Sequence, residues 1–376
     1  MKRHCCLCTF LVLISRGAFA QAPQSPSDPQ APPASPAPSV WSAGPIDFSG
    51  LVDVYYSLNF SHPASQTNQL RNFDTEANQF GLNMAKVVLE HKADPVGFRL
   101  DIGFGSAFDV IHAAEPRGGL NSFHYIEQAY GSVNVAKGTL DFGKFVTAMG
   151  AEVIETHPNW NYSRSLLFAW AVPYYHFGLR YSYPLHKTFT GMIHVVNGWN
   201  NVKDNNSGKS VGFSGTWTPS SHFSWAHNYM VGPENTGTNS GLRHMYDTTA
   251  TVTVNDKLAF MGNFDHGTNS FGNDLGKAGW RGVAGYVKLS PVGWFAIVPR
   301  LEWFDDHDGF NTGTAQKLKE VTLTAEFKMK EGFLTRLEYR RDWSDQPFFD
   351  RGDTLGSHKN QDTLLAGLVV YFGPKR

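Results

Sequence analysis

The feature that most constrains the fold of this chain is an alternation of short and long connections between segments whose hydrophobicity has a period of two. Such segments are typical of β-strands when Gly, Pro, Asn or Asp bounds them. We expect about sixteen strands, at 47–59, 78–91, 96–108, 124–135, 138–147, 174–184, 189–197, 210–218, 222–231, 243–254, 258–266, 280–289, 293–305, 317–329, 333–342 and 360–372.

Every second connection between these segments is tight, and the connections between the tight ones are polar and roughly ten to twenty-six residues long. A transmembrane barrel has an even number of antiparallel strands, with short turns at its inner end and longer loops at its outer end. A soluble sandwich has no reason to sort its connections in this way. The pattern therefore predicts an all-β, antiparallel, up-and-down transmembrane β-barrel. The tight connections lie at 93–95, 136–137, 185–188, 219–221, 255–257, 290–292 and 330–332.

The faces of the clearer strands agree with this prediction. In 47–59, Val52 and Val54 share one face, and Asp53 lies on the other. Charged residues that face a wet lumen, and apolar residues that face lipid, produce this alternation. A half-exposed soluble sheet would produce it as well, but tryptophan favours the membrane, because its ring prefers the headgroup level. Tryptophans fall at the expected outer strand ends (Trp199, Trp280, Trp303, Trp343) and at the inner ends (Trp217, Trp294).

Some residues do not fit a simple alternation. Lys86 and Glu90 lie among apolar neighbours, and Glu127 stands directly beside Gln128. Pro299 falls inside a strand, where a closed sheet loses a ladder hydrogen bond unless the strand is bulged. The sequence alone gives no account of these positions.

The N-terminal part predicts export. Lys2 and Arg3 precede the short apolar run 5–14, and Ala18-Phe19-Ala20 is a small-x-small cleavage pattern, so we expect residues 1–20 to be a signal peptide. Residues 21–45 are rich in proline, alanine and serine and are expected to form a disordered spacer. The barrel is then expected at 46–376.

Composition excludes several classes of protein. The cysteines are Cys5, Cys6 and Cys8, so cleavage of the signal peptide removes every thiol, and with it any disulfide or thiolate metal site. With 32 basic and 33 acidic residues, the charge does not indicate nucleic-acid binding. The mature chain has no apolar stretch long enough for a transmembrane helix, no phosphate-binding loop and no nucleophile elbow.

Seven short motifs are specific, and these are Phe142–Thr147, Gly150–Glu152, Asn161–Leu166, Tyr175–Arg180, Arg300–Asp306, Asp308–Gly309 and Thr312–Thr314. They resemble the OmpL-like β-barrel porin family of Gram-negative bacteria. The chain departs from the usual pattern at its end, where Phe372 is followed by Gly373-Pro374-Lys375-Arg376 instead of ending in the aromatic residue that the barrel-assembly machinery reads. The resemblance implies an outer-membrane barrel with pore activity.

A barrel of about sixteen strands is wide enough for an aqueous channel. The longest expected loop, 148–173, contains a helical segment around 165–170, and the resemblance implies that it folds inward and forms the constriction. Acidic residues on the loop opposite arginines on the wall would create a field across the opening that favours polar solutes. In the competing interpretation, Glu152 and Arg164 pair and pin the loop. The candidate constriction and lining residues are Glu152, Glu155, Arg164, Arg180, Arg300, Arg336, Glu338 and Arg340.

The sequence leaves other functions open. Asp305–Gly309 suggests a calcium loop or a hydrolase site at the barrel rim, but an acidic turn explains it better, because the further carboxylates of a calcium loop are missing. We expect His157 and His176 to be structural. We expect no cofactor, no metal and no enzymatic activity, with an outer-membrane hydrolase or a non-conducting structural or adhesive barrel as alternatives. The expected partners are outer-membrane lipid and lipopolysaccharide, small polar solutes, the barrel-assembly machinery and further copies of the chain in a trimer.

Overall fold

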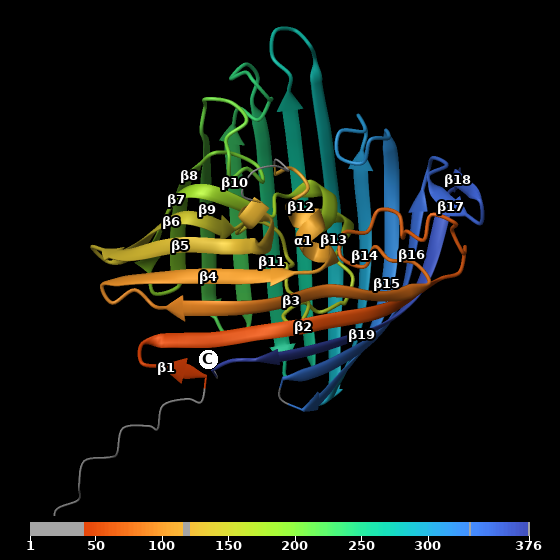
Figure 1. The fold of residues 1–376 in the computed structure, drawn as a ribbon, viewed down its shortest axis with the longest axis horizontal. Helices are drawn as coiled ribbons and strands as arrows, with labels where there is room; N and C mark the ends of the chain where they lie inside the picture. The colour runs from red at the N-terminus through yellow and green to blue at the C-terminus, as the bar shows by residue number, and fades with distance from the viewer. Residues whose placement is uncertain (1–40, 116–120, 331, 375–376) are drawn as a thin grey trace, which may run out of the picture. The chain divides into compact units, whose positions relative to one another are not determined.

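The computed structural model describes residues 41–115, 121–330 and 332–374. Within these residues the chain forms one closed ring of sixteen antiparallel strands, and the predicted up-and-down barrel is confirmed (Figure 1). The predicted signal peptide and residues 21–40 of the spacer lie outside the described residues. The strands are β2 (Ile46–Asn59), β3 (Gln79–His91), β4 (Val96–Phe104), β5 (Ile126–Val135), β6 (Gly138–Val146), β7 (Tyr175–His186), β8 (Phe189–Val196), β9 (Ser210–Ser220), β10 (Phe223–Gly232), β11 (Arg243–Asn255), β12 (Leu258–Ser270), β13 (Lys277–Val292), β14 (Phe295–Asp306), β15 (Gln316–Lys330), β16 (Phe333–Ser344) and β19 (Asn360–Phe372).

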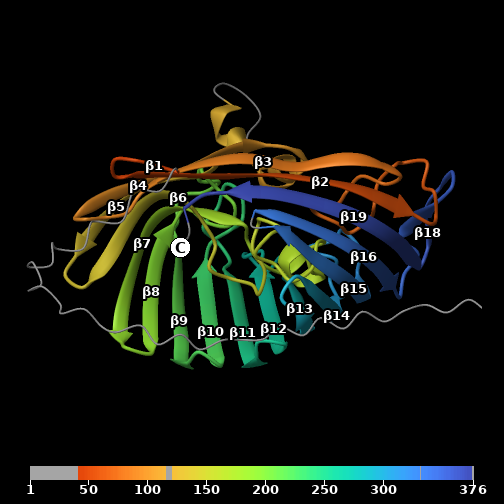
Figure 2. The same cartoon turned by 90° about the horizontal axis from the view of Figure 1, so that it is seen from below.

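The last strand closes the ring onto the first. β19 pairs with β2 in a continuous antiparallel register from Thr363↔Asn59 to Phe372↔Gly50. The other strands pair with their neighbours in the sequence, so β2 to β4 form one side of the ring and β8 to β12 the opposite side (Figure 2). A closed sheet leaves no row of unpaired backbone groups, which is the condition for strands to span lipid.

The two ends of the barrel carry different connections. One end, here called the turn end, has tight turns, such as the one between β5 and β6, together with the start of β2 and the end of β19. The other end, here called the loop end, has longer connections, among them 60–78, 105–125, 147–174, 307–315 and 345–359. The last of these contains a small hairpin of β17 (Phe349–Arg351) and β18 (Thr354–His358).

Several predicted strand boundaries are wrong. The strand expected at 96–108 ends at Phe104, because Gly105 adopts a φ of 126° and the chain then forms the helix α1 (Ser106–Ile111). β12 and β13 extend beyond the predicted 258–266 and 280–289, so the connection between them is only 271–276. Further short helical segments are η1 (Asn121–Tyr125) and η2 (Leu167–Ala171), and η2 lies close to the predicted helical segment at 165–170. No helix in the described part of the chain is long and apolar enough to cross a membrane.

Residues 41–45, predicted as the end of the spacer, pack on the barrel instead. β1 (Ser42–Ala43) pairs with the start of β2, and the N–H of Phe48 donates to the carbonyl of Trp41 over 2.7 Å. The Trp41 ring lies 4.9 Å from that of Phe372, between ring centres. These five residues therefore belong to the barrel.

The alternation of faces is clearest in β15. Leu318, Glu320 and Thr322 point into the ring and are buried, whereas Val321 and Leu323 on the outer face are exposed. A strand with a carboxylate on its buried face and apolar residues on its exposed face has the polarity of a membrane barrel and not that of a soluble sandwich.

Pro299 is accommodated by a gap in the ladder. It pairs with Leu323 of β15 on one side. On the other side, the register between β13 and β14 runs from Tyr286↔Arg300 to Leu289↔Ile297 and skips Pro299. A proline without an N–H is tolerated where the ladder is already interrupted.

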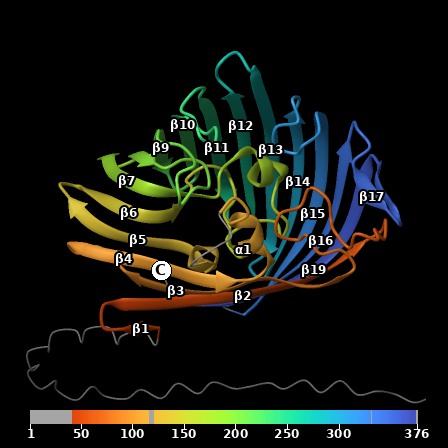
Figure 3. The same cartoon turned by 45° about the horizontal axis from the view of Figure 1, so that its top comes forward.

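The apolar core lies inside the ring. Three connections of the loop end, 60–78, 105–125 and 147–174, contribute Phe73, Phe108, Leu166 and Phe168, all of which are buried and belong to one cluster. Figure 3 shows α1 and the yellow-green connection between β6 and β7 within the circle of strands. The interior of the barrel is thus occupied by inward-folded segments.

Candidate functional site

The connection 147–174 folds into the ring and bonds to walls on opposite sides of it. The amide of Asn228 in β10 donates to the carbonyl of Ala148 over 3.2 Å, and the indole N–H of Trp280 in β13 donates to that of Ala171 over 3.1 Å. The phenol of Tyr162 donates to Asp53 in β2 over 2.7 Å. We call residues 148–173 the inner loop. Because strands from several sides hold it, it is a fixed part of the interior.

Arg336 in β16 anchors the part of the inner loop around residues 156–161. Its guanidinium donates to the carbonyls of Thr156 (2.7 Å) and Asn161 (2.8 Å) and also to that of Asn159. The same group pairs with Glu326 in β15 over 2.6 Å. Arginine suits this role, because its planar fork of donors can satisfy a carboxylate and several carbonyls at once.

Arg300 in β14 holds the next part of the inner loop. It donates to the carbonyl of Ser163 over 2.7 Å, pairs with Glu152 of the loop over 2.9 Å, and pairs with Glu320 of the wall over 3.0 Å. Both Arg300 and Glu152 are buried. A buried charge is tolerated only when it is paired and hydrogen-bonded, and this arrangement meets that condition.

Arg340 and Glu338, on the same strand as Arg336, are further wall residues that bind the inner loop. Arg340 donates to the carbonyl of Arg164 over 2.6 Å. Glu338 accepts the backbone N–H groups of Tyr162 (2.6 Å) and Ser163 (2.9 Å). Wall residues thus satisfy both the donors and the acceptors of the loop backbone, as buried backbone groups require.

The pair of Glu152 with Arg164, which the competing interpretation expects, does not form. Glu152 pairs with Arg300 instead, and it accepts the N–H of Ser165 over 2.7 Å. Arg164 donates to the carbonyls of Val153 (3.0 Å) and Tyr162 (2.5 Å), within the loop. The loop is therefore pinned by charged residues, as the competing interpretation expects, but through different partners.

Glu155 lies on the opposite side, at the wall of β3 to β5. Its carboxylate contacts the ammonium of Lys86, which also lies 3.3 Å from Asp101 and 3.0 Å from Glu127. Carboxylate oxygens of the three acids lie within 4.8 Å of one another, so they could hold a metal ion. The ammonium already contacts all three, however, and Arg99 neutralises Asp101 from 2.8 Å.

Strand irregularities explain why the sequence does not predict this cluster. The register between β4 and β5 shifts at Asp101↔Gln128 and Ile102↔Ile126, which leaves Glu127 as an extra residue. A β-bulge places two consecutive residues on one side, so Glu127 and Gln128 are both buried. Asn83 is the corresponding extra residue in β3. The only sign of this cluster in the sequence is that the charged residues Lys86 and Glu127 interrupt the expected alternation of their strands.

Arg180 is not brought together with the inner loop. It pairs with Asp141 over 2.7 Å and lies over the rings of Tyr130 and Phe145, at 5.4 Å and 4.4 Å from the ring centres. Nearby, towards the turn end, the inner wall has a hollow of about 310 Å³. Its lining includes Glu90, Arg99, Tyr130, Ser132 and Asp141.

The remaining candidate residues form ordinary packing contacts. Asp306 accepts the N–H groups of Phe310 (2.9 Å) and Thr312 (2.7 Å), so it orders an acidic turn. The ring of His176 stacks on His194 with centres 5.0 Å apart, and His157 stacks on Tyr371 at 4.5 Å. These contacts agree with the structural roles predicted for both histidines.

The contact between Glu155 and Lys86 predicts how the inner loop responds to acid. Burial alone would raise the pKa of Glu155, but the Lys86 ammonium lowers it from 4.5 to about 2. Since the folded-state pKa is depressed, the contact stabilises the docked loop fully above about pH 4.5 and is lost as the pH falls towards 2. Hydrogen exchange of residues 148–173 should therefore be constant from pH 7 to 5, after correction for intrinsic rates, and rise below this range.

The matched variants are Glu155→Gln and, in an exposed turn, Asp256→Asn. The first should show increased exchange of the inner loop at pH 7, and the second should behave as wild type. If the loop of the wild-type protein loosened between pH 7 and 5, Glu155 would not be the group that responds.

A comparison with family models matches residues 45–372 to the family described as Putative beta-barrel porin-2, OmpL-like. A search of curated proteins gives no match.

Solved structures share the fold at low identity. An anion-selective porin from Comamonas acidovorans has a TM-score of 0.60 and 10% identity, covering 87% of this chain and 99% of that chain. The outer membrane channel DcaP of Acinetobacter baumannii has a TM-score of 0.60 and 10% identity, covering 88% and 99%. OmpT of Vibrio cholerae, an outer membrane protein, has a TM-score of 0.57 and 13% identity, covering 87% and 97%.

Proposed function

Because the chain belongs to the family of OmpL-like β-barrel porins, we propose that it forms a water-filled passage through which small polar solutes or ions diffuse. Membership in this family and the likeness to porins support a location in the outer membrane and a channel rather than an enzyme. The observation that carries the proposal is the inner loop, which narrows the ring and is held by charged side chains of the wall.

The turn-end half of the lumen supports a polar passage. Small hydroxyl-bearing side chains line the inner faces of β7 and β9 to β11 and remain half-buried, whereas the wall facing the inner loop is fully buried. A lining of hydroxyl groups exchanges hydrogen bonds with water or polar solutes without holding them tightly. These residues include Ser182, Ser214, Thr216, Ser224, Thr249 and Thr251.

We assign the charged candidates two roles in this passage. Most of them set the width of the constriction by fixing the inner loop, and these are Glu152, Glu155, Arg164, Arg300, Arg336, Glu338 and Arg340. Arg180 instead contacts solutes, together with Arg99. The side chains of Arg180 and Arg99 retain 16% and 22% exposure, compared with 0% for Arg300.

Planar-bilayer recording tests the channel itself. Purified, folded protein should give discrete, ohmic current steps, and boiled protein should give none. Folded protein that inserts, as judged by its heat-modifiable migration on a gel, but never conducts would refute the proposal in favour of a non-conducting barrel.

Ion selectivity tests the role of Arg99 and Arg180. Replacing both with glutamine removes positive charge from the passage, so the reversal potential in a salt gradient should shift towards cation selectivity. Arg281→Gln is the matched control, because this side chain is 55% exposed and lies on the outer face. An equal reversal potential in all three proteins would remove these two arginines from the filter.

We further propose that the protein is exported by cleavage of residues 1–20, inserted by the barrel-assembly machinery and assembled as a trimer. A trimer form is described for OmpT of Vibrio cholerae, which supports the last point. Native mass spectrometry of the detergent-solubilised protein would give the number of subunits. It would also give the mass of the mature chain, and therefore the position at which the signal peptide is cleaved.

A further inference from the structure

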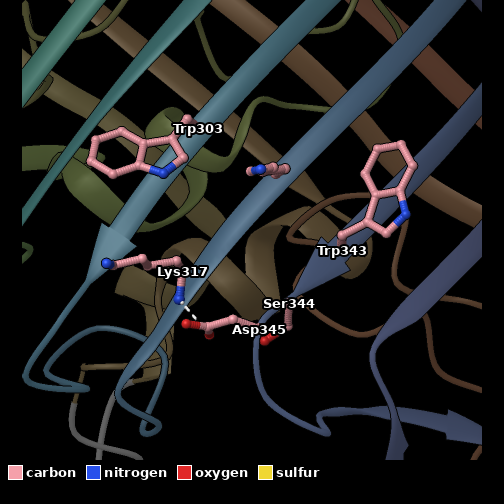
Figure 4. Close-up of a pocket in the computed structure, with 6 residues that line it drawn as sticks. Trp303, Lys317, Trp343, Ser344 and Asp345 are labelled. Atoms are coloured by element: carbon pink, nitrogen blue, oxygen red, sulfur yellow. Dashed lines mark hydrogen bonds between the residues drawn. The ribbon is translucent and has the colours of Figure 1, made fainter.

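Two tryptophans and a lysine form a row across the outer face of the barrel, close to the loop end. Lys319 of β15 lies directly opposite Trp303 of β14 on one side and Trp343 of β16 on the other. Lys317 is two residues nearer to the loop end on the same strand and face. Together with Ser344 and Asp345, these four residues line a groove of about 570 Å³. Figure 4 shows the two indole rings on either side of the groove, with Lys317 and Asp345 nearer to the loop end.

This groove has unbalanced positive charge. Among the described residues, the ammonium groups of Lys317 and Lys319 have no carboxylate within ion-pair distance. Asp345 also lines the groove, and its carboxylate accepts the backbone N–H of Lys317 over 2.8 Å, so the two ammonium groups leave one positive charge in excess. Surface lysines without acidic partners are ordinary in water, but on the face of a barrel that contacts lipid they need a counter-charge.

Two arginines lie beside the groove, and each of them has an acidic partner. Arg281 lies over the Trp303 ring at 5.7 Å from its centre and pairs with Asp305. Arg341 lies over the Trp343 ring at 5.0 Å and pairs with Asp362. Since both guanidinium groups have acidic partners, the two ammonium groups remain for an external anion.

The depth of the groove indicates what that anion is. Towards the middle of the same outer rows, the exposed residues are apolar, among them Leu301, Leu323 and Leu337. The groove therefore lies where the apolar band ends, and tryptophan at this position marks the level of the lipid headgroups. Lysine side chains there can direct their ammonium groups towards headgroup phosphates while their methylene stems contact apolar surface.

We propose that this groove binds the phosphate-bearing headgroup of an outer-leaflet glycolipid of the lipid A type, with its acyl chains along the apolar rows below. A phosphate monoester offers three strong acceptor oxygens, so two ammonium groups can bind it together more readily than they can bind a phosphodiester, which has two free oxygens. The site goes beyond the channel function and does not depend on conductance.

Native mass spectrometry of the full, detergent-solubilised protein tests the site with three probes: lipid A, lipid A treated with phosphatase, and phosphatidylglycerol. The wild-type protein should retain lipid A, and its affinity for the other two lipids should be lower. The double variant Lys317→Gln, Lys319→Gln should bind lipid A roughly tenfold more weakly.

The matched control is Lys328→Gln, Lys330→Gln, which makes the same change of charge at the opposite end of β15. It should bind lipid A as wild type does, and all variants should keep the heat-modifiable migration of a folded barrel. Equal binding of lipid A by the two double variants would overturn the site. Equal binding of the dephosphorylated lipid or of phosphatidylglycerol would overturn the assignment to a phosphate monoester.

Discussion

Replacing Arg336 with alanine is expected to release the inner loop and to change the single-channel conductance. The guanidinium holds three loop carbonyls and the carboxylate of Glu326 in a buried position. Without the guanidinium, the three buried loop carbonyls lose their donor at about 1–3 kcal/mol each, so the docked state of the loop should lose about 3 kcal/mol or more. A loss of about 3 kcal/mol corresponds to a roughly hundredfold rise in the undocked population.

The expected signal is a larger mean conductance with frequent transitions between levels, because a loop that leaves the wall no longer fixes the narrowest section. Lys288, 3.1 Å from Glu326, will compensate part of the lost charge, so the barrel itself should still fold. Arg336→Lys should fall between the wild-type protein and the alanine variant, since one ammonium cannot reproduce the fork of donors.

The control for this experiment lies on the same strand. Arg341 is on the outer face of β16 with a side chain that is 37% exposed, and its alanine variant should conduct as wild type does. If Arg336→Ala and Arg341→Ala gave the same conductance and the same noise, the wall arginines would not position the loop, and the proposed constriction would have to be placed elsewhere.

The barrel could be predicted from the sequence because its signal is repeated. Each strand needs only a period of two, and each hairpin needs a turn, so the errors at individual ends, such as 96–108, do not change the strand count or the order. The register follows from the same alternation, because a slip by one residue would turn charged residues such as Glu320 and Glu326 towards lipid.

The site could be predicted only in part, because its contacts join residues far apart in the sequence. Arg300, Arg336, Glu338 and Arg340 were identified from strand phase alone, and phase is enough to place a side chain inside. The alternation along a strand does not, however, identify which residues a side chain contacts inside the barrel. The sequence therefore leaves the partner of Glu152 open between a wall arginine and Arg164. Bulged positions such as Glu127 have no predicted orientation, since a bulge breaks the period on which the prediction rests.

A larger side chain next to Tyr162 should displace the inner loop by steric overlap while every charged residue that binds the loop stays in place. Gly367 in β19 faces the Tyr162 ring so closely that a Cβ at this position would lie 2.2 Å from a ring carbon. The ring cannot easily move away, because its hydroxyl donates to Asp53 over 2.7 Å and its backbone N–H donates to Glu338 over 2.6 Å. Gly367→Val should therefore displace the loop at a cost of about 1–3 kcal/mol, the usual penalty for overpacking.

We expect Gly367→Val to lower the temperature at which the folded band is lost on a gel and to produce the same enlarged, noisy conductance as Arg336→Ala. Gly285→Val is the matched control, because nothing lies within 4 Å of the position of its Cβ on the outer face of β13. The decisive measurement is a double-mutant cycle with Tyr162→Ala, which removes the ring that the valine would strike. If steric contact carries the effect, adding Gly367→Val to Tyr162→Ala should cost little further stability, whereas simple additivity of the two losses would mean that the valine acts on the strand and not on the loop.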